Sequence, residues 1–297
     1  MRITTETLTT VLLRSINDTS SRLADVQSHI ATSKRINDPS DDPAGLFQSL
    51  SMHSQVSEYK RGVDAIGYAR GWLETTEQGL TQIQEQVLRA RTLALNAGNG
   101  TLSEDELHAI SSEMRQLLNA VASAGNTQYQ DQYVFSGYAT KDAPFTTTTT
   151  GAGATTVAYA AQPGDIVVSL GRNSPFVVNS DLQSTFDLVI NALQGLTDDL
   201  AAGDSSSIQS TWLGQLDQAI GAVGDAQADA GGKIRNLDLA SDYLSARLIQ
   251  EQKVLSQTED LDMAAASLEV AKAQTTYQAV LTLTAKALQP GLVAYLR

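Results

Sequence analysis

The sequence predicts a mainly α-helical protein whose two chain ends form a long coiled coil or helical bundle, with a small β-rich insert between them. Near the N-terminus, apolar residues are separated by alternating steps of three and four, interrupted at Thr19, and the same spacing returns between Ile234 and Leu248. This alternation is typical of a coiled-coil seam. We therefore expect the chain to pair its own ends as a hairpin-shaped rod, with the middle directed outward.

Composition excludes several function classes. The chain has 297 residues, of which 42% are hydrophobic and only 5% aromatic, which suits long thin bundles. Its net charge of −13 argues against a nucleic-acid partner, because such binding depends on basic side chains that neutralise phosphates. The chain has no cysteine, so disulfides are excluded. The opening residues resemble neither a signal peptide nor a membrane span, so we expect no cleavable signal and no membrane partner.

The helices can be placed from their start and stop signals. A first helix from Ile3 to about Ile36 is expected to end at Asn37-Asp38-Pro39, because proline disfavours helix at the residue before it. A second helix is expected over residues 44–97, and Ser103 with Glu106 forms a capping box for a third. The last helical stretch is predicted to continue to the C-terminus, with a soft point at Gly231-Gly232.

The middle of the chain has a different pattern. Residues 129–135 are aromatic and β-branched, and residues 166–168 and 176–178 are typical of short strands. The threonine run at 146–150 is interpreted as a mobile loop. These features predict a small β-rich domain.

Catalysis has little support. Asp41 and Asp42 suggest acid-base chemistry, but no nucleophile or metal-ligand cluster accompanies them. His29, His53 and His108 are widely separated and are expected at surface positions. We therefore predict no enzyme activity and no catalytic, cofactor-binding or metal-binding residue. A generic coiled-coil scaffold remains an alternative.

Several motifs resemble the flagellin superfamily. The string from Arg35 to Leu46 resembles its helix-break signature, and residues 75–77 and 99–101 resemble its first core helix and the following turn. Residues 259–262 and 292–297 resemble its terminal helix. The resemblance covers about residues 1–140 and 230–297. Its signature residues here are Arg35, Asn37, Asp38, Pro39, Asp41, Asp42 and Pro43.

The resemblance leaves two roles open. Pro39, Pro43 and the segment 132–138 are similar to members that join the flagellar hook to the filament. Ala44-Gly45 is closer to flagellins that build the filament itself, which remains the alternative. The junction role implies a structural adaptor in the extracellular flagellum, exported unfolded and folded at the growing tip. Its implied partners are further copies of itself in a ring, the first hook-filament junction protein, flagellin, and a cytoplasmic export chaperone that binds the C-terminal helix.

The resemblance also divides the chain into domains. Residues 1–43 and 253–297 are expected to form a terminal coiled coil that is disordered in the monomer. Residues 44–138 and 185–252 would form the helical core domain, and residues 139–184 the β-rich outer domain. The residues predicted to form assembly seams are Leu12, Ile16, Leu23, Val26, Ile30, Leu237, Leu244, Leu248, Leu255, Leu261, Leu268, Leu281 and Leu288.

Overall fold

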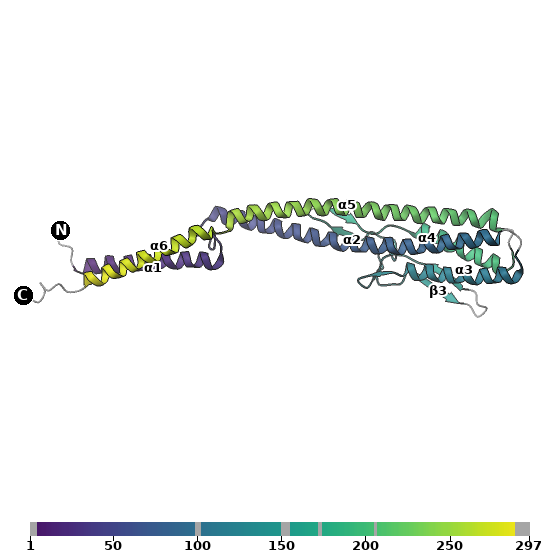
Figure 1. Ribbon diagram of the computed structural model, residues 1–297, viewed down its shortest axis with the longest axis horizontal. Helices are drawn as coiled ribbons and strands as arrows, with labels where there is room; N and C mark the ends of the chain where they lie inside the picture. The colour runs from purple at the N-terminus through teal and green to yellow at the C-terminus, as the bar shows by residue number, and fades with distance from the viewer. Residues whose placement is uncertain (1–4, 99–101, 150–154, 172–173, 205–206, 289–297) are drawn as a thin grey trace, which may run out of the picture. The chain divides into compact units, whose positions relative to one another are not determined.

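The computed structural model describes residues 5–98, 102–149, 155–171, 174–204 and 207–288 (Figure 1). Contacts divide the chain into two compact units. Unit 1 comprises residues 1–57 and 248–297, and unit 2 comprises residues 58–247.

Six α-helices dominate the described residues, which confirms the predicted mainly helical fold class. A short π-helical segment at Ile208–Trp212 precedes the fifth α-helix. The α-helices are α1 (Thr5–Thr32), α2 (Pro43–Ala97), α3 (Glu104–Gly125), α4 (Gln183–Ala201), α5 (Leu213–Glu259) and α6 (Met263–Leu288).

Helix α1 ends earlier than predicted. Ser33 has a positive φ of 57°, and its N–H donates to the Ile30 carbonyl, while the Lys34 N–H donates to the His29 carbonyl. This pair of bonds is a Schellman motif, which satisfies the last carbonyls of a helix. The helix therefore stops at Thr32 through its own C-terminal geometry, and Pro39 lies well beyond that stop.

The predicted continuous C-terminal helix is wrong, because the chain leaves the helix between α5 and α6. The Asp262 carboxylate accepts the N–H groups of Ala264 and Ala265 at 2.9 and 3.1 Å and so caps the start of α6. Helix α5 instead passes through Gly231-Gly232 without a break. Next to these glycines, Lys233 Nζ donates to the Asn179 carbonyl and to Ser180 Oγ, both at 2.7 Å.

The capping box of α3 is confirmed. Glu106 N–H donates to Ser103 Oγ, and the Glu106 carboxylate accepts the Ser103 N–H at 2.8 Å. Ion pairs then join α3 and α5 to α2: Arg89 contacts Glu113 at 2.6 Å, and Arg91 contacts Asp217 at 2.5 Å. These pairs are exposed, so their contribution to stability is small.

The described strands form three separate two-stranded antiparallel sheets. The predicted strands near 166 and 176 are confirmed, but the threonine run is not a loop: Thr146–Thr149 are in a strand, and Thr150 lies outside the described residues. The pairs are β1 (Gln128–Tyr129) with β2 (Gln132–Tyr133), β3 (Phe145–Thr149) with β4 (Thr155–Tyr159), and β5 (Val167–Ser169) with β6 (Pro175–Val177).

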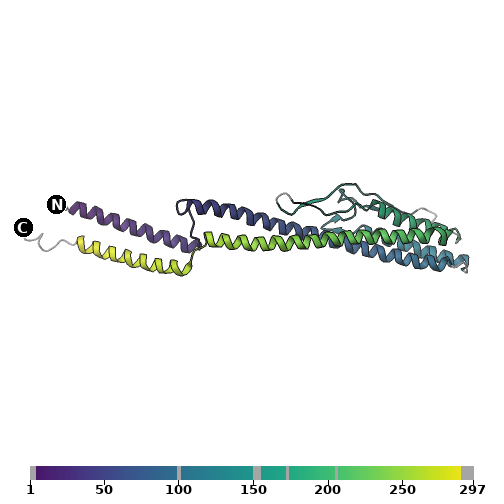
Figure 2. The same cartoon turned by 90° about the horizontal axis from the view of Figure 1, so that it is seen from above.

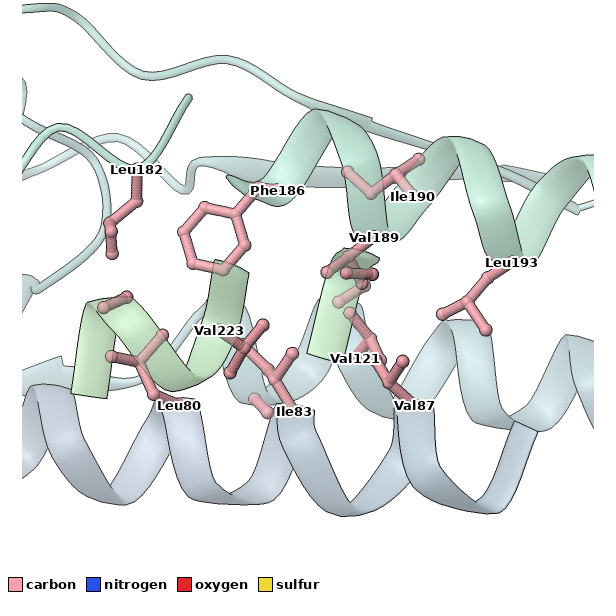
Figure 3. Close-up of a cluster of buried hydrophobic side chains, with 14 of the residues drawn as sticks. Leu80, Ile83, Val87, Val121, Leu182, Phe186, Val189, Ile190, Leu193 and Val223 are labelled. Carbon is pink, nitrogen blue, oxygen red and sulfur yellow. The ribbon is translucent and has the colours of Figure 1, made fainter. Parts of the chain in front are cut away.

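The apolar core of unit 2 lies between α2, α3, α4 and α5 (Figure 3). Phe186 of α4 is fully buried, and its ring packs against the rings of Phe135, Phe145 and Tyr159 at centroid distances of 5.2, 5.1 and 4.8 Å. Through these rings the β3–β4 hairpin is anchored to the helices. The labelled core side chains of Figure 3 are Leu80, Ile83, Val87, Val121, Leu182, Phe186, Val189, Ile190, Leu193 and Val223.

We expect Phe186→Ala to lower the free energy of unfolding by about 3–5 kcal/mol, because it removes a buried aromatic ring and leaves a cavity. Chemical denaturation followed by circular dichroism measures this change. Tyr138→Ala is the matched control, since Tyr138 is 70% exposed, and it should change stability by no more than about 0.5 kcal/mol. Equal losses in both variants would contradict the assigned core.

Candidate assembly site at the chain ends

Helices α1 and α6 lie side by side in unit 1 (Figures 1 and 2). On α1, the residues predicted to form a seam are all half-buried, whereas most of the other described α1 side chains are exposed. Thr19, which interrupts the seam, donates its hydroxyl to the Ser15 carbonyl at 2.8 Å. The half-buried seam residues of α1 are Leu12, Ile16, Leu23, Val26 and Ile30.

The two sequence arguments gave different partners for this seam. Apolar spacing suggested residues 234–248, whereas the resemblance paired residues 1–43 with residues 253–297. Helix α1 contacts α6, which lies within residues 253–297. Of the predicted α5 residues, Leu237 is buried and Leu244, Leu248 and Leu255 are half-buried. Leu237 and Leu244 belong to unit 2, where Leu244 lies next to Gly62 of α2. At Leu244 the apolar face of α5 therefore packs against α2 and not against α1.

On α6, the buried and half-buried side chains again alternate steps of four and three. The expectation that Leu268 and Leu281 lie in this seam is wrong, since they are 74% and 40% exposed. The alanine-rich composition of α6 hid the correct face, because small residues there give a weak apolar pattern. Leu261 is half-buried between α5 and α6, and the Leu288 side chain lies outside the described residues. The α6 residues of the seam are Ala266, Val270, Ala273, Tyr277, Val280 and Thr284.

Glu259, the last residue of α5, places a buried carboxylate at the center of a polar cluster. Its carboxylate accepts hydrogen bonds from Ser49 Oγ and from His53 Nε2, both at 2.7 Å, and it forms an ion pair with Lys34 Nζ. Only 6% of Glu259 is exposed. We call Lys34, Ser49, His53 and Glu259 the Glu259 cluster. It joins the end of α1, the start of α2 and the end of α5.

Burial of the Glu259 carboxylate raises its pKa, but the bonds from Lys34, Ser49 and His53 outweigh burial and lower the pKa from 4.5 to about 2. Glu259 is therefore ionised at neutral pH. A negative charge at a helix C-terminus is unfavourable, because the helix dipole is negative there. The cluster therefore depends on the Lys34 cation, and removing either partner would leave an uncompensated charge.

Backbone bonds reinforce the cluster. The Arg35 N–H donates to the Glu259 carbonyl at 2.7 Å, and the Leu261 N–H donates to the Ser33 carbonyl at 3.0 Å. The Arg35 guanidinium donates to the Thr258 carbonyl at 2.8 Å and to Asp42 Oδ2 at 3.2 Å. A cation that caps the final carbonyls of a helix is favourable. Arg35 therefore ties the α1–α2 connection to the end of α5.

Asp41 and Asp42, the adjacent carboxylates of the sequence signature, cap backbone groups. Asp41 Oδ2 accepts the N–H groups of Asp38 and Asn37, each at 2.9 Å, and these two bonds lower the Asp41 pKa. Asp42 Oδ1 accepts the Gly45 N–H at 2.9 Å, which lowers the Asp42 pKa. Asp42 is thus the N-cap of α2.

The two prolines of the signature lie on either side of these carboxylates. Pro43 is the first helical residue of α2, a position that proline favours. Pro39 is exposed in the connection between α1 and α2.

The sequence did not identify the whole cluster. Lys34, Ser49 and His53 were not predicted as site residues, and His53 was expected at the surface. Its side chain is 49% exposed but reaches the buried carboxylate. The available signal was the spacing of Ser49 and His53, which places them one turn apart on one helix face.

Two features are absent from the described part of the chain. No group of three or more metal-ligating side chains occurs among the described residues. Within the same residues, no helix combines the length and apolarity that crossing a bilayer requires.

Two family models match the two parts of the chain that meet in this site. The family model of the bacterial flagellin N-terminal helical region matches residues 3–140, and that of the C-terminal helical region matches residues 213–296. The Glu259 cluster draws Lys34, Ser49 and His53 from the first region and Glu259 from the second.

Individual relatives are more distant. The chain is 28% identical over 155 residues to flagellar hook-associated protein 3 of Salmonella typhimurium, which covers 51% of this chain and 48% of the relative. The chain thus spans about half the length of that relative. It is 24% identical to flagellar hook-associated protein 3 of Escherichia coli, covering 77% of this chain and 70% of the relative. The solved structure of FlgL from Bacillus cereus matches with a TM-score of 0.59 at 22% identity, over 69% of this chain and 99% of that one.

The fold and the joined chain ends define a mainly helical protein whose N- and C-terminal regions meet at one site. The two family models together cover most of the chain and place its helical ends in the same two regions. The chain belongs to the bacterial flagellin family.

We expect Glu259→Gln to weaken the contact between the α1–α2 connection and the end of α5 by about 1.5–3 kcal/mol, since it removes charged hydrogen bonds. Trypsin cleaves after Lys34 and Arg35, and both residues bond to the end of α5 in this contact. Trypsin should therefore cut after them at least about tenfold faster in the variant, because about 1.4 kcal/mol corresponds to a factor of ten. Glu269→Gln, an exposed carboxylate on α6, is the control. Equal cleavage rates in all three proteins would rule out a structural role for the cluster.

The Glu259 cluster should also make the stability of unit 1 sensitive to acid. Because the folded pKa of Glu259 lies below its ordinary value, its contribution to stability is full above about pH 4.5 and is lost as the pH falls toward about 2. Denaturation followed by circular dichroism at several pH values measures the free energy of unfolding. This free energy should fall less across the window in Glu259→Gln than in the unmodified chain. An identical fall in both would contradict the lowered pKa of Glu259.

Proposed function

We propose that the protein is a structural adaptor at the junction between the flagellar hook and the filament. The main support is that the relatives in Salmonella typhimurium and Escherichia coli are both flagellar hook-associated protein 3. The segment 132–138 and the prolines of the signature favour the same role. In this role the protein performs no catalysis, and its function is mechanical adaptation between two polymers.

The surface of unit 1 supports assembly. Most of the large exposed apolar side chains belong to unit 1, although unit 2 is the longer part of the chain. Exposed large apolar side chains that are concentrated in one part of a protein favour an interaction site there. Contacts with neighbouring subunits would bury it. The exposed apolar residues of unit 1 are Leu8, Val11, Leu13, Phe47, Leu50, Ile249, Met263, Leu268, Leu281 and Leu283.

The partners in this proposal are a ring of identical copies, the first hook-filament junction protein on one side and flagellin on the other. An export chaperone would bind the C-terminal helix before secretion, and the protein would act outside the cell. We further propose that residues 1–40 and 255–297 pair only weakly in the free monomer, and that assembly stabilises the paired state. Residues 139–184 would then form the outer domain.

The alternative role is that of the filament flagellin. Ala44-Gly45 favoured it in the sequence, but Gly45 has a local explanation. A Cβ atom there would meet the Asp42 carboxylate and lie 2.8 Å from the end of the Ile36 side chain, so both side chains would have to move to admit another residue. Local packing therefore accounts for a small residue at this position, and Gly45 does not separate the two roles.

Deletion of the gene distinguishes the two roles. Electron microscopy of the mutant cells and a blot of the medium for flagellin should show bare hooks and abundant secreted flagellin. That result is expected because flagellin would lack the surface on which it polymerises. Bare hooks without flagellin in the medium would identify this protein as the filament subunit, and intact filaments would overturn both roles.

Leu23→Asp should abolish incorporation into the flagellum while leaving unit 2 folded. The substitution places a charge in the half-buried α1–α6 seam, which costs several kcal/mol. Ala24→Asp is the matched control, because Ala24 is the next residue on α1 and is exposed. Immunogold labelling measures incorporation, and circular dichroism checks the fold. Normal incorporation of Leu23→Asp would contradict the role of the seam.

A further inference from the structure

The β5–β6 hairpin lies along α5 and is held at both of its ends. At its tip, the Leu170 carbonyl lies so close to Gly62 of α2 that a Cβ atom there would be 2.5 Å from it, and the Leu244 side chain of α5 meets the same point. At its other end, Lys233 Nζ of α5 donates to the Asn179 carbonyl at 2.7 Å. The hairpin therefore follows α5 from the level of Leu244 to the level of Lys233.

The outer face of this hairpin presents a row of exposed side chains. Ile166 and Val168 pack against the core of unit 2, so the residues that alternate with them face outward. Asp165, Val167 and Ser169 are all exposed, and Val167 is 56% exposed. We call Asp165, Val167 and Ser169 the strand row.

Helix α5 presents a second row on a different face. Leu237 is buried in unit 2 and Leu244 meets Gly62, whereas Leu239 and Tyr243 are 69% and 58% exposed. Arg235, four residues before Leu239, is exposed as well. Residues four apart lie on one face of a helix. We call Arg235, Leu239 and Tyr243 the helix row.

The two rows lie at the same height along unit 2. Both can be measured from Gly62, where the hairpin tip meets α5. From that point, Val167 lies about 10 Å back along the strand, and Leu239 lies about 7.5 Å back along the helix. The corresponding distances are about 16.5 Å for Asp165 and about 13.5 Å for Arg235. The rows therefore agree in order, spacing and height to within about 3 Å.

We propose that the strand row of one copy packs against the helix row of the next copy in the ring. Copies that all face the same way around a ring meet through two different surfaces, the heterologous arrangement that closes rings. Because the two rows have equal height in each chain, neighbouring copies bring Val167 to Leu239 and Asp165 to Arg235 without a shift along their length. This inference rests on the proposed ring of copies and names the surfaces through which the copies meet.

Charge favours a second copy as the occupant, although each chain carries a net charge of −13. In the part of the chain that the structure describes, Asp165 and Arg235 form no ion pair, so each can pair with the other across the contact. The Arg247 guanidinium lies 5.3 Å from the centre of the Tyr243 ring and adds positive charge beside the helix row, against the carboxylate of Asp242. Two identical rows would bring equal charges together. Opposite charges therefore select the contact between unlike rows, and repulsion disfavours the others.

Cross-linking in isolated flagella tests this contact, and the chain has no cysteine that would interfere. The double variant Val167→Cys/Leu239→Cys carries both halves of the contact. A short bifunctional maleimide should link its copies into a ladder of dimers and larger products, seen on a denaturing gel blotted for this chain. Either single variant should give at least about tenfold less product, because each row faces the other row and the contact raises the effective concentration of unlike thiols only.

Val167→Cys combined with Leu88→Cys is the matched control. Leu88 is a leucine of α2 that is 46% exposed and lies outside both rows. This pair carries the same number of cysteines and should give no more product than the single variants. A ladder of equal intensity from the Leu88 pair would overturn the proposal, and so would the absence of a ladder from the Leu239 pair.

Charge reversal tests which residues meet. Arg235→Asp added to the Val167→Cys/Leu239→Cys variant should weaken the ladder by about threefold or more, because Asp165 would then face a carboxylate. Adding Asp165→Arg as well restores opposite charges and should restore the ladder. A ladder that ignores the first reversal, or that the second reversal fails to restore, would overturn the pairing of Asp165 with Arg235.

The contact and the junction role fail in different ways. A ladder from cells whose gene deletion gives bare hooks without secreted flagellin would retain the contact and reject the junction role. No ladder, together with abundant secreted flagellin after deletion, would retain the junction role and reject the contact.

Discussion

The ionised carboxylate of Glu259 is the interaction on which unit 1 depends. It sits at the negative end of a helix dipole and is almost fully buried, two conditions that each disfavour a charge. The Lys34 cation and the hydroxyl and imidazole of Ser49 and His53 compensate for both. Because these groups come from segments more than 200 residues apart in sequence, the charge is satisfied only when the two ends of the chain meet.

The two units bury apolar surface to different degrees. Unit 2 has a continuous core in which large side chains such as Trp72, Phe186 and Leu193 are fully enclosed. Unit 1 pairs α1 with α6 through a seam whose side chains are mostly half-buried, and it leaves many apolar residues exposed. A pair of helices cannot enclose its own apolar face, so unit 1 gains most from further subunits. This contrast fits the proposed role, since a polymer subunit needs one part that folds alone and another that neighbours complete.

The β3–β4 hairpin is tied to the helices by two side-chain amides. Strand β4 is covered by Gln194 and the first residue of β3 by Asn126, so each side-chain amide replaces the backbone of an absent strand.

The sequence alone determined the helical class, the α3 capping box, two of the strands and the family, because each depends on local spacing or on short motifs. It also identified the α1 seam residues, whose apolar pattern is strong. Apolar spacing alone did not show that this seam faces α6, because the small residues of α6 give little apolar contrast; only the family resemblance implied that pairing. The sequence also did not show that Glu259 gathers Lys34, Ser49 and His53. A buried ion pair between distant segments leaves no periodic signal in the sequence. Only the tertiary structure decides which charges meet, since burial and the geometry of three helix ends determine which partners a carboxylate can reach.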